Sequence, residues 1–111
     1  MQLINKKCKP CEGGIPKLTS SEIKSYSLQL NQPWQVVDDM KISKDFHFKD
    51  FLHTIIFVNR VAEIAEIEGH HPVMHVYYSK VQIELWTHAI LGLSENDFIL
   101  AAKTDKIFES L

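Results

Sequence analysis

The sequence has few of the features that mark secreted, membrane-embedded or nucleic-acid-binding proteins. Cysteine occurs only 2 times in 111 residues, too rarely for a disulfide framework. No apolar run approaches the ~20 residues that span a bilayer, and residues 1–10 lack the apolar core of a signal peptide. Lys and Arg number 12 and Asp and Glu 14, so the net charge of -2 provides no basic surface for nucleic acids or anionic membranes. We therefore expect a cytoplasmic protein that binds neither.

The composition is that of a single globular domain. Hydrophobic residues make up 45% and charged residues 23% of the chain, far from the balance of a disordered protein. A chain of 111 residues can bury one core but hardly two. Prolines and glycines cluster between residues 10 and 16, before any hydrophobic periodicity begins. We therefore expect an extended N-terminal arm over residues 1–18 and one folded domain over residues 19–111.

Cys8 and Cys11 form a CxxC pair within this arm. A closed zinc site needs four ligands, and a thioredoxin-type site needs a strand before the pair and a helix after it. Because neither pattern is present, we expect two reduced thiols at the surface. A redox or metal clip is the alternative, and a thiol titration with and without chelator would reveal it.

The hydrophobic pattern of residues 19–111 alternates between helical and strand periods. Thr19 with Glu22 fits a capping box, and Gly69 fits a left-handed helix C-cap. The predicted elements are a helix from Thr19 to about Asn31, strands over 34–38 and 41–48, a helix over 49–68, strands over 73–78 and 81–86, and a helix from Ser94. This order, α-β-β-α-β-β-α, predicts an α+β fold with a four-stranded antiparallel sheet and three helices packed on one face.

Two neighbouring histidines, His70 and His71, lie where the long helix is expected to end. Gly69 ends that helix and Pro72 restricts the backbone of His71, so the pair is held at a stiff junction. His88 follows the last strand and is expected near the start of the strand before it. The three imidazoles would then line one cleft. Because imidazole changes charge near neutral pH, such a cluster suits acid–base chemistry.

Other roles for these histidines remain open. A zinc site built on the pair would need further ligands such as His75 or Glu66, since successive residues of an extended chain point to opposite sides. No motif in the sequence fixes such a geometry. Capping or hydrogen bonding is the commoner role of a single histidine, and we expect it for His47, His53 and His75.

The spacing of these residues resembles that of the pterin-4a-carbinolamine dehydratases. The family pattern places a charged residue, His-His-Pro, an aromatic residue, a histidine and an aspartate at fixed intervals. The matching positions are Glu66, His70-His71-Pro72, Tyr78, His88 and Asp97. Two further stretches of the same kind are Trp34-Gln35-Val36-Val37 and Gly92-Leu93-Ser94. The resemblance extends from about Gly13 to Ile107.

The resemblance implies a hydro-lyase that dehydrates 4a-hydroxytetrahydropterin to quinonoid dihydropterin. It also implies a role in tetrahydrobiopterin biosynthesis and recycling beside an aromatic amino acid hydroxylase, and a homodimer or homotetramer. Loss of the C4a hydroxyl needs a proton on the leaving oxygen and removal of the N5 proton, so several imidazoles are useful. His70 and His88 are the expected proton-transfer groups, while His71 is expected to position the substrate and to share in the transfer. No cofactor and no metal are expected.

The resemblance further implies residues that contact the pterin: Gly69, Trp86, Thr87, Ala89, Trp34 and Glu66. For Trp34 core packing is an equal alternative, and Glu66 either orients an imidazole or is a solvated carboxylate. Asp97 lies three residues after Ser94, so we expect a capping box rather than a substrate contact. Val73 stands where many members have an acidic residue after His-His-Pro, from which we expect an altered rate.

A second hypothesis is a non-catalytic module of the same fold. The resemblance allows it, because family members in animals also act as a dimerisation partner of a homeodomain transcription factor. Such a protein-binding, dimerisation or transcriptional coregulator module would bind a partner protein without accelerating the decay of a hydroxypterin. The edge strands and an exposed Trp86 would favour such an interface.

Overall fold

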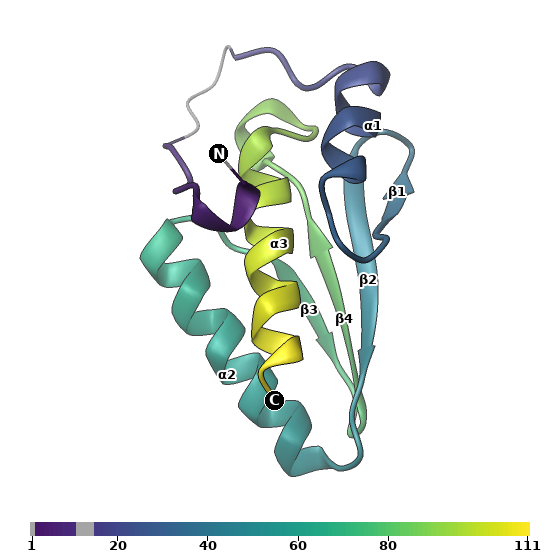
Figure 1. Cartoon of the computed structure of the whole chain (residues 1–111), viewed down its shortest axis with the longest axis vertical. Coiled ribbons are helices and arrows are strands. Elements are labelled where there is room, and N and C mark those ends of the chain that lie inside the picture. Colours follow the sequence, from purple (N-terminus) through teal and green to yellow (C-terminus); the bar gives the residue numbers. More distant parts are fainter. Residues whose placement is uncertain (1, 11–14) are drawn as a thin grey trace.

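A computed structural model describes residues 2–10 and 15–111 of the chain (Figure 1). In chain order its elements are η1 (Leu3–Asn5), α1 (Ser20–Leu28), β1 (Gln35–Val37), β2 (Lys41–His47), α2 (Phe51–Glu68), β3 (Val73–Val76), β4 (Lys80–Leu85), η2 (His88–Ile90) and α3 (Glu95–Glu109). The α+β class and the predicted order of helices and strands are confirmed. None of the described helices is long and apolar enough to cross a membrane.

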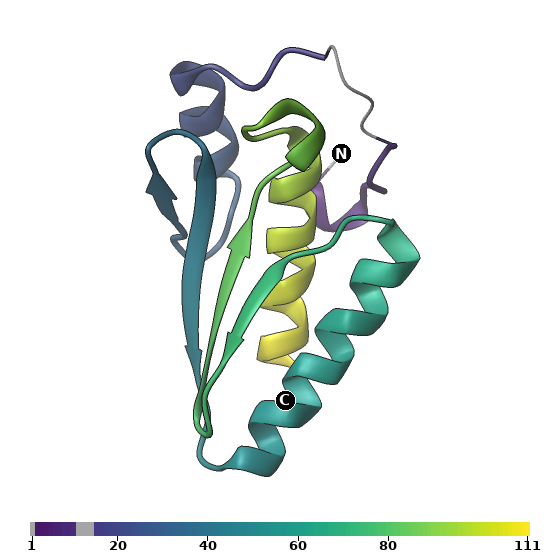
Figure 2. The same cartoon turned by 180° about the vertical axis from the view of Figure 1, so that it is seen from behind.

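The strands form one antiparallel sheet in the order β1-β2-β4-β3. Figure 2 shows the face of this sheet that the helices leave uncovered, with α3 behind the strands and α2 along the side of β3. The first hairpin turns at Asp38 and Asp39, whose φ angles of 52° and 54° fit the two left-handed positions of a type I′ turn. In the second hairpin Val73 pairs with Glu84, so the start of β3 lies beside the end of β4. That register brings the chain before β3 close to the chain after β4.

The core lies between the sheet and the layer of α2 and α3. Alternate residues of β4 are fully buried, as the period of 2 predicts: Val81, Ile83 and Leu85. Phe46 of β2 packs against Phe57 of α2, with ring centroids 4.9 Å apart. At the other end of the layer, Tyr26 of α1 stacks on Phe98 of α3 at 5.3 Å. These contacts fix the positions of the helices and strands. The candidate functional residues lie near the ends of these elements.

The N-terminal segment is docked on the helices instead of lying free. Its 3₁₀ turn η1 lies against α3 (Figure 1), and Leu3 is only 3% exposed. Cys8 is 6% exposed, and its backbone N–H donates to Glu68 Oε1 at 2.7 Å. The expectation of two surface thiols is therefore wrong for Cys8, while Cys11 lies outside the described residues. The sequence of the predicted arm did not indicate this packing, because the apolar residues that dock are isolated and form no periodic pattern.

The burial of Cys8 predicts an unreactive thiol. Burial, reinforced by the negative charge of Glu68, raises the pKa of Cys8 from 9.0 to about 12. The C11S variant, whose one thiol is Cys8, should react with a disulfide reagent at pH 8 only after denaturant is added, because the thiolate is the nucleophile. Rapid reaction of the native variant would contradict the docked segment.

The same shift predicts how stability depends on pH. A group whose pKa is raised by folding contributes fully below its unfolded pKa, and the contribution is lost as pH rises toward the folded value. The Cys8 contribution should therefore decline between pH 9 and about 12. A C8A variant should lack this part of the alkaline decline when unfolding is followed by circular dichroism.

Candidate active site

The three predicted imidazoles line one pocket of about 310 Å³, at the end of the sheet where α2 leads into β3. His70 and His71 reach it from the connection between α2 and β3, and His88 reaches it from η2 after β4. The other lining residues are Lys9, Gly69, Pro72, Val73, Trp86, Thr87, Ala89 and Asn96. Of the predicted pterin contacts, Gly69, Trp86, Thr87 and Ala89 are thus brought together.

Gly69 sets the direction in which the chain leaves α2. Its φ of 66° lies in the left-handed region, and its N–H donates to the carbonyl groups of Ala65 and Glu66. A Cβ at this position would meet no atom within 4 Å, so glycine is required by the backbone angle and not by space. The next N–H, that of His70, also donates to the Ala65 carbonyl at 3.2 Å. The predicted C-cap thus places His70 at the pocket.

His88 is positioned by a short turn after β4. The N–H of Thr87 donates to the Gly92 carbonyl at 2.8 Å, which closes the loop containing η2. The imidazole of His88 lies 4.6 Å from the ring of Trp86, measured between centroids, and is exposed to solvent. This imidazole is therefore open to water.

Asp97 contacts the imidazole of His70 and fixes its orientation. The carboxylate is fully buried, and its Oδ1 lies 2.6 Å from Nε2 of His70, whose side chain is 11% exposed. Its Oδ2 accepts from the Thr87 hydroxyl at 2.8 Å and from the Ser94 N–H at 3.0 Å. Because an ionised carboxylate only accepts, the Nε2 of His70 is the donor, and Nδ1 of the neutral ring is left as a proton acceptor.

The sequence predicted only part of the role of Asp97. The capping box with Ser94 is confirmed. The contact with His70 was not predicted, although both residues belong to the same pattern of intervals. The two residues are 27 positions apart, since His70 follows the end of α2 and Asp97 lies at the start of α3. No local sequence pattern predicts a contact over that distance.

Glu66 contacts the second histidine of the pair. Its Oε1 lies 2.8 Å from Nε2 of His71. This contact agrees with the expectation that Glu66 orients an imidazole. Both side chains are exposed, by 62% for His71 and 78% for Glu66. Ion pairs in water contribute little energy, so this contact orients His71 more weakly than Asp97 orients His70.

Trp34 does not reach the pocket. It is buried in the core, where its Nε1–H donates to Asp105 Oδ2 at 3.1 Å and its ring meets Phe46 edge-on. Burial raises the pKa of Asp105, and hydrogen bonds from Lys44 and Trp34 offset part of that rise. The structure therefore shows core packing, the alternative role of Trp34, and not a wall of the histidine pocket.

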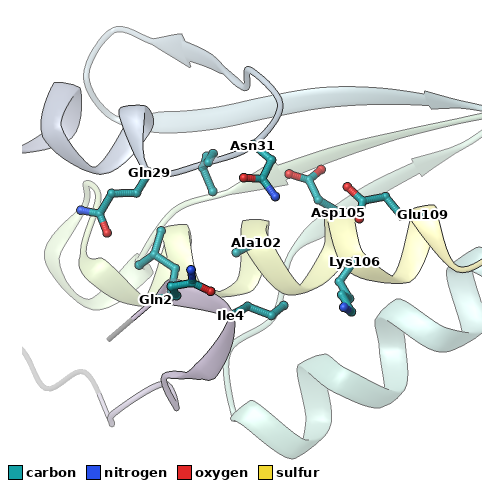
Figure 3. A pocket seen from close by; sticks show the side chains of 10 residues that line it. Gln2, Ile4, Gln29, Asn31, Ala102, Asp105, Lys106 and Glu109 are labelled. Carbon is teal, nitrogen blue, oxygen red and sulfur yellow. The ribbon is translucent and has the colours of Figure 1, made fainter.

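A larger cavity of about 670 Å³ lies elsewhere, between η1, the chain after α1 and α3. Figure 3 shows the side chains of Gln2 and Ile4 from the N-terminal segment facing it, with Asp105 and Glu109 of α3 farther along. Neither a histidine nor a cysteine lines this cavity. The smaller pocket, which three imidazoles line, is therefore the candidate active site.

His53 and His75 lie outside the pocket and contact carboxylates. Nδ1 of His53 lies 2.6 Å from Asp50, and Nε2 of His75 lies 2.8 Å from Glu84. The expected hydrogen-bonding role of these two residues is confirmed. Over residues 2–10 and 15–111, no three His, Cys, Asp or Glu side chains are arranged so that they could hold a metal ion.

Lys9 and Asn96 are pocket residues that the sequence did not indicate. The backbone N–H of Lys9 donates to Asn96 Oδ1 at 3.0 Å, and the Asn96 amide donates to the Lys9 carbonyl at 2.6 Å. These residues are 87 positions apart and belong to no periodic pattern. Only the docking of the N-terminal segment brings Lys9 to the pocket.

The chain matches a known family along most of its length. Residues 16–107 match the family model described as pterin 4 alpha carbinolamine dehydratase. A Nitrosomonas europaea protein provisionally named as such a dehydratase is 51% identical over 108 residues, 97% of this chain and 95% of that protein. One from Alkaliphilus metalliredigens, also named provisionally, is 48% identical over 104 residues, 94% of each chain.

Two solved structures are also similar. A transcriptional coactivator/pterin dehydratase from Brucella melitensis has a TM-score of 0.77 and 36% identity, covering 82% of this chain and 97% of that one. A pterin dehydratase-like RuBisCO assembly factor of the alpha-carboxysome has a TM-score of 0.61 and 22% identity, covering 70% and 92%. At that identity the second structure supports the fold alone.

Two buried threonines provide a matched test of the Asp97 network. Thr87 donates to Asp97, whereas the hydroxyl of Thr104, equally buried, has no partner among the described residues. We expect T87V to lower the free energy of unfolding by about 1–3 kcal/mol, because it leaves a buried carboxylate short of a donor. T104V should leave stability unchanged or raise it. Urea denaturation measures both, and equal losses would contradict the network.

Proposed function

Because this chain belongs to the pterin 4 alpha carbinolamine dehydratase family, a group of hydro-lyases, we propose that it dehydrates a 4a-hydroxytetrahydropterin with His70, His71 and His88. The product is a quinonoid dihydropterin. The observation that supports this proposal is the common pocket of the three imidazoles, one of which is fixed by a buried carboxylate.

The reaction requires one proton to be delivered and one to be removed. The bond between C4a and the hydroxyl oxygen breaks, and that oxygen takes a proton and leaves as water. The N5–H proton departs, and its electron pair forms the C4a=N5 double bond. Protons and electrons balance without an oxidant or a reductant, so an acid and a base on one site suffice.

His70 is suited to be the base. Asp97 accepts the hydrogen of Nε2, which leaves Nδ1 to take the N5 proton. Because Asp97 is buried and its second oxygen has two donors, it stays in place while the imidazole becomes charged. A buried carboxylate stabilises such an imidazolium in other enzymes that combine aspartate with histidine.

His88 is suited to be the acid. Its exposure lets it take up a proton from water after each turnover and give it to the departing hydroxyl. The neighbouring Trp86 offers a flat apolar surface to the pterin ring, and Gly69, Thr87 and Ala89 complete the binding surface. His71, oriented by Glu66, positions the substrate and shares in proton transfer.

The proposal includes the context expected from the sequence. The substrate is the product of an aromatic amino acid hydroxylase, so the enzyme serves tetrahydropterin recycling in the cytoplasm. It acts as a homodimer or homotetramer without a cofactor or metal, and neither nucleic acids nor membranes are its partners.

A protein-binding module is the second candidate function. It is favoured by the similar structure from Brucella melitensis, which is a transcriptional coactivator/pterin dehydratase. For this chain, a partner protein bound without any acceleration of hydroxypterin decay would support the second candidate against the first.

Stopped-flow absorbance of 4a-hydroxytetrahydropterin decay tests the proposal. The wild type should accelerate the decay, and H70A and H88A should each reduce kcat by a factor of about 10² to 10⁴, the usual share of one acid or base. H71A should raise KM more than it lowers kcat. H47A, which removes an exposed histidine of β2 outside the pocket, is the control and should match the wild type. Full activity of H70A would refute the assignment of the base.

Independence from metal is a separate prediction. Elemental analysis of the purified protein should find substoichiometric zinc, and a strong chelator should leave kcat unchanged, because histidines alone supply the acid and the base. Stoichiometric zinc that is lost together with activity would instead indicate a metal-dependent enzyme.

A further inference from the structure

The charge of the pocket lining is one-sided. It contains Lys9 and the three histidines, while no Asp or Glu is among the described residues that line it. Asp97 lies beneath His70 and is fully buried, and Glu66 faces His71 from α2. Among the described residues that line the pocket, the one permanent positive charge is that of Lys9, whose side chain is exposed.

The backbone of Lys9 is held at the rim by two hydrogen bonds to a single side chain. Asn96 accepts from the Lys9 N–H at 3.0 Å and donates to the Lys9 carbonyl at 2.6 Å. Asn96 is itself buried at the start of α3. A lysine on a free chain end has no such support, so the backbone position of Lys9 is set by the fold.

The preceding residue is fixed as well. The Cys8 N–H donates to Glu68 Oε1 at 2.7 Å, and Glu68 Oε2 accepts from Lys103 at 2.8 Å. Burial by itself would raise the pKa of Glu68, but the hydrogen bonds from Lys103 and Cys8 lower it, so a charged carboxylate anchors the segment.

Both anchors are sequence neighbours of the residues that form the catalytic pair. Glu68 precedes His70 by two positions, and Asn96 directly precedes Asp97. The N-terminal segment is therefore attached to the backbone that sets the His70–Asp97 contact. The segment lies before residue 16, where the match to the family model begins.

We propose that Lys9 is a specificity-determining residue, which selects pterins whose side chain has an anionic group, a phosphate ester or a carboxylate. This inference rests on the proposed dehydratase function. The pterin ring lies among the histidines and Trp86, and a side chain extending from it to the rim brings its anion to the Lys9 ammonium. Charge-assisted hydrogen bonds of this kind are stronger than neutral ones.

Binding of oxidised pterins, followed by their fluorescence, tests the inference without relying on turnover. The ligands are 6-hydroxymethylpterin, its phosphate ester and 6-carboxypterin. The wild type should bind the anionic pterins about fivefold more tightly than the neutral one, as for an ion pair at an exposed rim. K9M should abolish this ratio and K9R should keep it, while an ionic strength of about 0.5 M should reduce it.

K7M is the matched control. Lys7 belongs to the same segment, contacts the Ile67 carbonyl and does not line the pocket, so K7M should keep the wild-type ratio. A preference for only one of the two anionic ligands, lost in K9M, would support the inference and identify the group. Equal binding of all three ligands by the wild type, or a preference that survives K9M, would overturn it.

The dehydratase assay separates this inference from the proposed function. If the wild type accelerates hydroxypterin decay but Lys9 has no effect on the ratio, only the role of Lys9 is wrong. If the wild type binds none of the three pterins, the inference about Lys9 is wrong, and the decay of 4a-hydroxytetrahydropterin alone decides the proposed function.

Discussion

The buried carboxylate of Asp97 connects the parts of the fold on which the candidate active site depends. It caps α3 through the Ser94 N–H, accepts from Thr87 at the end of the sheet and contacts His70 after α2. A buried charge is costly unless it is fully hydrogen-bonded, so these three contacts support one another. The position of one imidazole is therefore determined by the same interaction that begins the last helix. A change in any of the three elements would be transmitted to the proposed base.

A second set of contacts attaches the N-terminal segment beside the first. Glu68 holds the Cys8 backbone and Asn96 holds the Lys9 backbone, one or two residues away from His70 and Asp97. The N-terminal segment is held by individual side chains and not by a paired strand or a packed helix. Its docking energy therefore comes from the hydrogen bonds of buried polar groups and from the burial of Leu3. The segment thus contributes to the pocket wall through Lys9 and to the hydrophobic core through Leu3 and Cys8.

Local patterns in the sequence predicted the elements, whereas contacts between distant residues could not be predicted. The period of 3.6 in α2, the period of 2 in β4 and the left-handed cap at Gly69 each depend on neighbouring residues, and each is confirmed. The burial of Cys8 depends on a contact 60 positions away, and the clamp on Lys9 on one 87 positions away. Trp34 illustrates the same limit, because an aromatic residue near a strand fits both a pocket wall and a core.

The candidate site consequently has a rigid half and a solvated half, and the proposed reaction requires both. A base must be presented to N5 in one tautomer and one orientation, which the buried Asp97 provides to His70. An acid must be reprotonated after each turnover, which requires contact with water, and His88 is exposed. A base as exposed as His71 would lose its fixed orientation, while an acid as enclosed as His70 would regain its proton slowly. The unequal burial of the three imidazoles is therefore the physical reason for assigning them different roles.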